Sequence, residues 1–197
     1  MSQSLFDPDA LRALPLWAAV HVASRAVRRI VLLLPARAGE SPTALLLAAC
    51  DAADRSASRG SRDEQDAFAL ARGASALGPA PIPAVAEAVR WLSDAAHAAT
   101  DALDFSAAEA ACRASVLAAL DAARSPYRLV GMTAIQPAIF IASDVDQLTF
   151  ACGELRVGTY DALPRGVFER LIPVRKPEVT PPDLDDPMRD DPTGGAR

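Results

Sequence analysis

The stretch AVAEAVRWLSDAAHAATDAL, residues 84–103, decides the fold class. Its larger apolar and alanine residues recur at alternating spacings of four and three, at Val85, Val89, Leu92, Ala96, Ala99 and Leu103. Because an α-helix has about 3.6 residues per turn, this spacing places them in one stripe along a helix face. A polar stripe is offset by two residues, with Glu87, Arg90, Asp94, His97 and Asp101. The stretch therefore predicts an amphipathic helix whose narrow seam packs against other helices.

The composition extends this prediction to the whole chain. Alanine makes up about a fifth of the 197 residues, and aromatic residues make up 5%. Alanine is the best helix former because it loses no side-chain entropy on ordering, and it is depleted in strands. We therefore predict an all-α fold, an irregular bundle of five to six closely packed helices.

Capping and breaking signals place the other helices. Asp7 followed by Pro8 begins the first helix, which runs to Leu34 unless Pro15 kinks it or marks its real start. Pro42 begins the second helix. Two S-x-x-E capping boxes, in which serine and glutamate satisfy each other's free amides, open the third and fifth helices at 61–64 and 106–109.

The pattern is less regular after Pro126. Residues 127–141 fit either a strand or a helix, and a helix beginning at Pro137 fits better because one apolar stripe follows it, at Ile141, Val145, Leu148 and Cys152. Gly153 is the expected C-terminal stop. We expect residues 154–172 to be ordered but irregular, and to close a helical domain spanning residues 1–172. Residues 173–197 form a Pro- and Asp-rich acidic tail that we predict to be disordered, because it cannot bury enough apolar surface.

Charge and cysteine content exclude several classes of protein. The net charge of -5 and the pI near 5.0 argue against nucleic-acid binding, which needs a basic surface. Three distant cysteines, Cys50, Cys112 and Cys152, suit neither a disulfide framework nor a zinc motif, so we expect buried, inert thiols. No signal peptide or membrane-spanning run is evident, so we expect a cytoplasmic protein with no membrane partner.

The first helix holds the main candidate binding residues. Residues 10–34 contain four arginines and no acid, with His21, Arg25, Arg28 and Arg29 along one side, whereas residues 84–124 contain six acids and three arginines. We expect the first helix to pack beside the fourth and fifth, with its arginines paired to those acids. The alternatives are a partner surface or an anion site, since guanidinium groups suit carboxylates and phosphates, and contact with RNA or DNA, which the overall charge disfavours.

A second candidate is the array Asp94-x-x-His97-x-x-x-Asp101, which has metal-ligand residue types at contact spacing on one helix face. A di-metal helical bundle needs a second carboxylate–histidine pair. The other histidine, His21, has no carboxylate at the matching offset. We therefore expect a solvated polar face, with no metal and no cofactor.

Two stretches carry a family resemblance. LPLWAAV at 14–20, followed by AVRR at 26–29, resembles the opening helix of a group of alanine-rich helical bacterial proteins with no assigned activity. Asp146 to Leu148, DALP at 161–164 and FERLIP at 168–173 are similar to the C-terminal pattern of that group. The resemblance implies an ordered segment up to about Pro173 and carries no catalytic residue across.

These observations favour a protein-interaction or adaptor module without catalytic activity, whose partner is another protein or a second copy of the chain. The alternative is a small helical-bundle enzyme or an anionic-ligand-binding protein that uses the Arg25, Arg28, His97 and Asp101 region. A pocket lined by these residues would favour the alternative. Arginines fully paired with carboxylates, with no cavity beside them, would favour the adaptor.

Overall fold

The structure is a computed structural model, and it describes residues 6–34, 42–78, 81–100, 104–124 and 135–174. Every regular element in these ranges is a helix, which confirms the predicted all-α bundle. The elements are a 3-10 helix, η1 (Pro8–Ala13), and the α-helices α1 (Leu16–Val31), α2 (Pro42–Arg59), α3 (Glu64–Ala74), α4 (Ile82–Thr100), α5 (Phe105–Ala122), α7 (Ile135–Glu154) and α8 (Arg165–Arg170).

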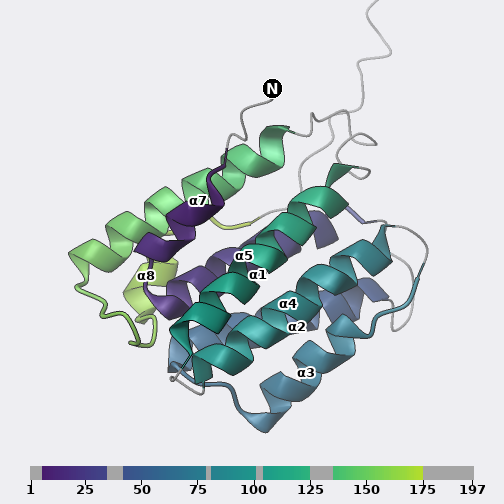
Figure 1. The fold of residues 1–197 in the computed structure, drawn as a ribbon, viewed down its shortest axis with the longest axis horizontal. Helices are drawn as coiled ribbons and strands as arrows, with labels where there is room; N and C mark the ends of the chain where they lie inside the picture. The colour runs from purple at the N-terminus through teal and green to yellow at the C-terminus, as the bar shows by residue number, and fades with distance from the viewer. Residues whose placement is uncertain (1–5, 35–41, 79–80, 101–103, 125–134, 175–197) are drawn as a thin grey trace, which may run out of the picture.

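Helix α1 is the centre of the bundle. It packs against α2, α4 and α5 on one side and against α7 on the other, as Figure 1 shows. All of its residues are buried except Arg28 and Arg29, which are half-buried. A helix that is buried around nearly its whole circumference belongs to the core, so the charged side chains of α1 need partners inside the protein.

Alanine allows α4 and α5 to pack closely. The predicted stripe of α4 is buried from Val85 to Ala99, while Leu103 lies outside the described residues. The Ser115 hydroxyl of α5 donates a hydrogen bond of 2.8 Å to the Ala88 carbonyl of α4. The described residues of the predicted polar stripe are exposed. The seam therefore faces the core, and the polar face does not.

Aspartates, and not the predicted serine–glutamate boxes, open α3 and α5. Asp63 accepts a hydrogen bond from the backbone N–H of Asp66 at 2.8 Å, and Asp104 accepts one from Ala107 at 2.8 Å. The predicted capping boxes at 61–64 and 106–109 are thus wrong by two residues. Aspartate caps as well as serine, and its charge also interacts favourably with the helix dipole.

Proline divides the predicted first helix. Pro15 has no N–H and follows Leu14, which is extended, so η1 ends before them and α1 begins at Leu16. The helix ends at Val31, before the predicted Leu34. Asp7 caps η1 as expected, since its side chain accepts from the Asp9 N–H.

Helix α7 has the predicted buried stripe, but it begins and ends at other residues than predicted. Ile141, Val145, Leu148 and Cys152 are buried. Helix α7 begins at Ile135, so residues 135–141 are helical. Residues 127–134 lie outside the described part of the chain. Residues 175–197 of the predicted tail also lie outside it. Helix α7 continues through Gly153 to Glu154, so the predicted stop at Gly153 is wrong. The segment predicted as irregular contains α8.

Among the described helices, none is both long and apolar enough to cross a bilayer.

Candidate functional site

The charged residues of α1 form two clusters with neighbouring helices. One cluster lies between α1 and α7. Arg25 Nη2 donates to Asp144 Oδ1 at 2.7 Å and to the Ile172 carbonyl at 2.7 Å. Arg29 Nη2 donates to both oxygens of Asp144, at 2.7 and 2.8 Å, and its guanidinium lies over the Phe140 ring. Asp144 is thus a buried carboxylate neutralised by two guanidinium groups.

The second cluster lies between α1 and α2. His21 Nδ1 is 2.7 Å from Asp54 Oδ1, and Arg28 Nη2 donates to Asp54 Oδ2 at 2.6 Å. Arg28 Nη1 also donates to Asp51 at 2.8 Å. Burial raises the pKa of Asp54, but the His21 ring and the Arg28 guanidinium outweigh that effect and lower the pKa below its usual value.

The predicted partners of these arginines were therefore wrong. Arg25, Arg28 and Arg29 pair with carboxylates of α2 and α7, not with the acids of residues 84–124. Helices α4 and α5 do pack against α1, as expected, but their buried residues are mostly alanine and valine, and acids such as Asp94 are exposed. Of the four arginines in residues 10–34, only Arg12 pairs with a predicted partner, because its Nε donates to Glu109 at 2.9 Å.

The other two predicted site residues lie elsewhere or outside the described part. His97 is exposed on α4, with its Nδ1 2.8 Å from Arg62 Nη2, and Asp101 is outside the described residues. The structure thus places His97 against Arg62, while Arg25 and Arg28 contact carboxylates from other helices. Within the described ranges, no group of three or more histidine, cysteine, aspartate or glutamate residues could hold a metal ion.

The His21–Asp54 pair has the arrangement in which a carboxylate orients a catalytic histidine, but its free nitrogen is covered. Nε2 is buried and has no hydrogen-bond partner. The ring packs edge to face with Phe168 of α8, with centroids 4.8 Å apart. In this conformation Nε2, the nitrogen that would contact a substrate, is buried, so the pair links α1 to α2.

The cysteines have the expected burial. Cys50, Cys112 and Cys152 are buried and unpaired. Burial raises the pKa of both Cys50 and Cys112 to about 12 and raises that of Cys152 as well. A thiolate is the reactive form of cysteine, so all three side chains are neutral, unreactive thiols near neutral pH.

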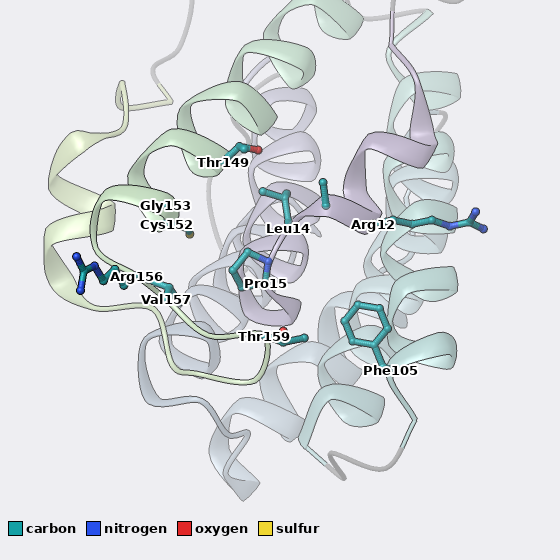
Figure 2. Close-up of a pocket in the computed structure, with 11 residues that line it drawn as sticks. Arg12, Leu14, Pro15, Phe105, Thr149, Cys152, Gly153, Arg156, Val157 and Thr159 are labelled. Carbon is teal, nitrogen blue, oxygen red and sulfur yellow. The ribbon is translucent and has the colours of Figure 1, made fainter.

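A pocket of about 410 Å³ lies beside the end of α7, away from the arginine clusters. Its walls come from the η1–α1 junction, the first residue of α5, the last turns of α7 and the loop that follows, as Figure 2 shows. We call it the α7-end pocket. Its volume lies within the range of small-molecule sites, roughly 300–1,000 Å³. A smaller hollow of about 260 Å³ lies between α2 and α3, with Phe68 and Arg72 at its edge.

The outward side of α7 carries large apolar residues that are exposed. Ile139 is 49% exposed and Phe150 is 67% exposed. Eleven residues span about three helical turns, so these two side chains point in nearly the same direction, opposite the buried stripe of α7. Asp146 and Glu154 are exposed on the same side. We call Ile139, Asp146, Phe150 and Glu154 the outer face of α7.

Neither the outer face nor the α7-end pocket was among the predicted sites. The signal for the outer face was present in the sequence, because Ile139 and Phe150 fall on the side of the helix opposite the predicted stripe. The pocket could not be found in this way, since it combines η1, α5 and α7, which are distant in the chain.

Comparisons with protein families, with curated proteins and with solved structures find no match to this chain.

Proposed function

We propose that this chain is a protein-interaction module without catalytic activity, and that it binds its partner through the outer face of α7. The observation that carries the proposal is that Phe150 and Ile139 are both exposed on one side of α7. The opposite side of this helix packs against the bundle. Isolated exposed apolar residues are common on protein surfaces. An aromatic and an aliphatic side chain aligned on one face are typical of helix-mediated contacts.

The charge of α7 supports a basic partner. The helix contains Asp144, Asp146 and Glu154 and no lysine, arginine or histidine. Asp144 is buried against arginines, while Asp146 and Glu154 remain exposed beside Phe150. Complementary charges steer association and set orientation. The partner we propose therefore presents an apolar helix face flanked by arginine or lysine.

The arginine clusters favour this function over the alternative. An enzyme or an anionic-ligand site built on Arg25, Arg28, His97 and Asp101 would need guanidinium groups that are free to meet a ligand. Instead, Arg25 and Arg28 bind carboxylates within the bundle at 2.6–2.8 Å. These ion pairs join α1 to its neighbours, whereas Ile139 and Phe150 on the outer face of α7 remain exposed.

Site-specific photocrosslinking tests the proposal. A photoreactive phenylalanine analogue is placed at Phe150 or at Ile139 in the full chain, and cells of the producing organism are irradiated. We expect the same protein adduct from both positions, and we expect Ile139→Asp to abolish crosslinking from position 150.

Phe68 is the matched control, because it is a 64% exposed phenylalanine on α3. The absence of an adduct from either α7 position would overturn the proposal, and so would the same set of adducts from position 68. An adduct with the mass of two 20.6 kDa chains would identify the partner as a second copy of this chain. That result would overturn the proposal of a basic partner.

A further inference from the structure

Two residues at the end of α7 contradict local conformational preference. Gly153 lies in the last turn of the helix, where glycine is among the least favourable residues. Arg156 has a φ of 52°, in the left-handed region that usually holds glycine. The turn is a Schellman motif, since the Val157 N–H donates to the Cys152 carbonyl at 2.9 Å and the Arg156 N–H donates to Gly153 at 3.2 Å. Alanine at 153 and glycine at 156 would both suit this backbone better.

Neither residue is explained by packing or pairing. A Cβ at position 153 would have nothing within 4 Å, so no neighbour requires a glycine there. The Arg156 side chain forms no ion pair with any carboxylate in the described part of the chain. Both residues line the α7-end pocket. Departures from local preference that nothing in the packing requires are typical of functional sites.

The lining of the pocket indicates the kind of ligand. Leu14, Pro15 and Val157 supply apolar surface, and none of the lining residues is acidic. In Figure 2, Arg12 and Arg156 lie at opposite ends with Leu14 and Pro15 between them, and both guanidinium groups point outward, away from these two residues. Arg12 is already paired with Glu109. This leaves Arg156 as the cation that can accept an anion from outside, and guanidinium groups bind carboxylates in a two-pronged geometry.

We infer that the α7-end pocket binds a small amphipathic carboxylate, with its apolar body along Leu14, Pro15 and Val157 and its carboxylate at the rim. There the exposed side chain of Arg156 turns inward to bind it. Gly153 leaves the wall of α7 open, so that the ligand can lie against the helix backbone. This inference goes beyond the proposed protein contact, which uses other side chains of α7.

Octanoate is the probe that tests this inference, with octanol as the uncharged control of equal chain length. Binding to the full chain is measured by titration calorimetry, and thermal unfolding is measured without ligand. We expect saturable binding of octanoate, weaker binding of octanol, and at least a tenfold loss of octanoate affinity in Arg156→Gly and in Gly153→Leu. We also expect Arg156→Gly to raise the Tm by about 2–4 °C, because it relieves the strained backbone.

The combination of higher stability and weaker binding separates a ligand site from a structural role. Unchanged octanoate affinity in Arg156→Gly would overturn the inference, and so would the absence of saturable binding to the wild-type chain. A lower Tm for Arg156→Gly would also overturn it, because it would show that the arginine side chain supports the fold. None of these outcomes depends on crosslinking at Phe150, so this inference and the proposed function can fail separately.

Discussion

Asp144 and Asp54 both bind arginines of α1, but they differ in burial and in redundancy. The Asp144 side chain is 1% exposed and is the only described carboxylate paired with Arg25 and Arg29. The Asp54 side chain is 24% exposed, and its partner Arg28 also binds Asp51. A buried charge that loses its partner is costly, whereas a partly exposed charge can turn to water or to a second partner. The attachment of α7 to α1 should therefore be more sensitive to substitution than that of α2.

Removal of Asp144 should have the largest effect. In Asp144→Ala both Arg25 and Arg29 lose their carboxylate, and Arg25 is nearly fully buried. Breaking a buried ion pair from one side costs about 3–5 kcal/mol. We expect a loss of this size in the free energy of unfolding, measured by urea denaturation at pH 7. A loss below about 1 kcal/mol, the range of exposed pairs, would show that the cluster is open to water.

Arg25→Ala should cost less than Asp144→Ala, because Asp144 keeps Arg29. The substitution removes one hydrogen bond to a carboxylate and one to the Ile172 carbonyl. One hydrogen bond to a charged group contributes about 1.5–3 kcal/mol, and Ile172 is exposed, so its carbonyl can bind water instead. We therefore expect a loss of about 2–3 kcal/mol by urea denaturation. An effect equal to that of Asp144→Ala would mean that Arg29 contributes nothing to holding the carboxylate.

Asp54→Asn should have a smaller effect that depends on pH. The pKa of Asp54 is lowered in the folded state, so its contribution to stability is present above its unfolded pKa, near about 3.9, and is lost as pH falls through the folded pKa. At pH 7 we expect a loss of about 1–2 kcal/mol, since the amide still offers hydrogen bonds.

Urea denaturation between pH 7 and pH 3 checks the direction in which the pKa of Asp54 is shifted. The gap in unfolding free energy between wild type and Asp54→Asn should narrow as the solution is acidified below about pH 4. A gap that stays constant or widens would contradict the assigned direction of the pKa.

The buried faces of the helices could be predicted from the sequence, but the pairing of one helix with another could not. Periodicity along one helix identified the buried faces of α4 and α7, because it depends only on residues a few positions apart. Which helix each face would meet depends on contacts such as Arg25–Asp144, which are 119 residues apart and leave no local pattern. One local signal was present, since Asp144 falls within the apolar stripe beside Ile141, Val145 and Leu148. An acid in a buried stripe needs a charged partner, so an internal ion pair could have been predicted there.

The Arg12–Glu109 ion pair lies at the surface. Of the ion pairs compared, it should contribute least to the free energy of unfolding. The Arg12 side chain is 60% exposed and Glu109 is 14% exposed, with 2.9 Å between Arg12 Nε and Glu109 Oε1. Exposed pairs contribute about 0–1 kcal/mol. We expect Arg12→Gln to lower the free energy of unfolding by no more than this at low salt, and we expect the difference to vanish in about 1 M NaCl, where charges are screened within about 3 Å. Arg25→Ala measured at the same two salt concentrations is the control, because a buried pair is screened much less. If both variants responded equally to salt, burial would not be what distinguishes the pairs of α1 from those at the surface.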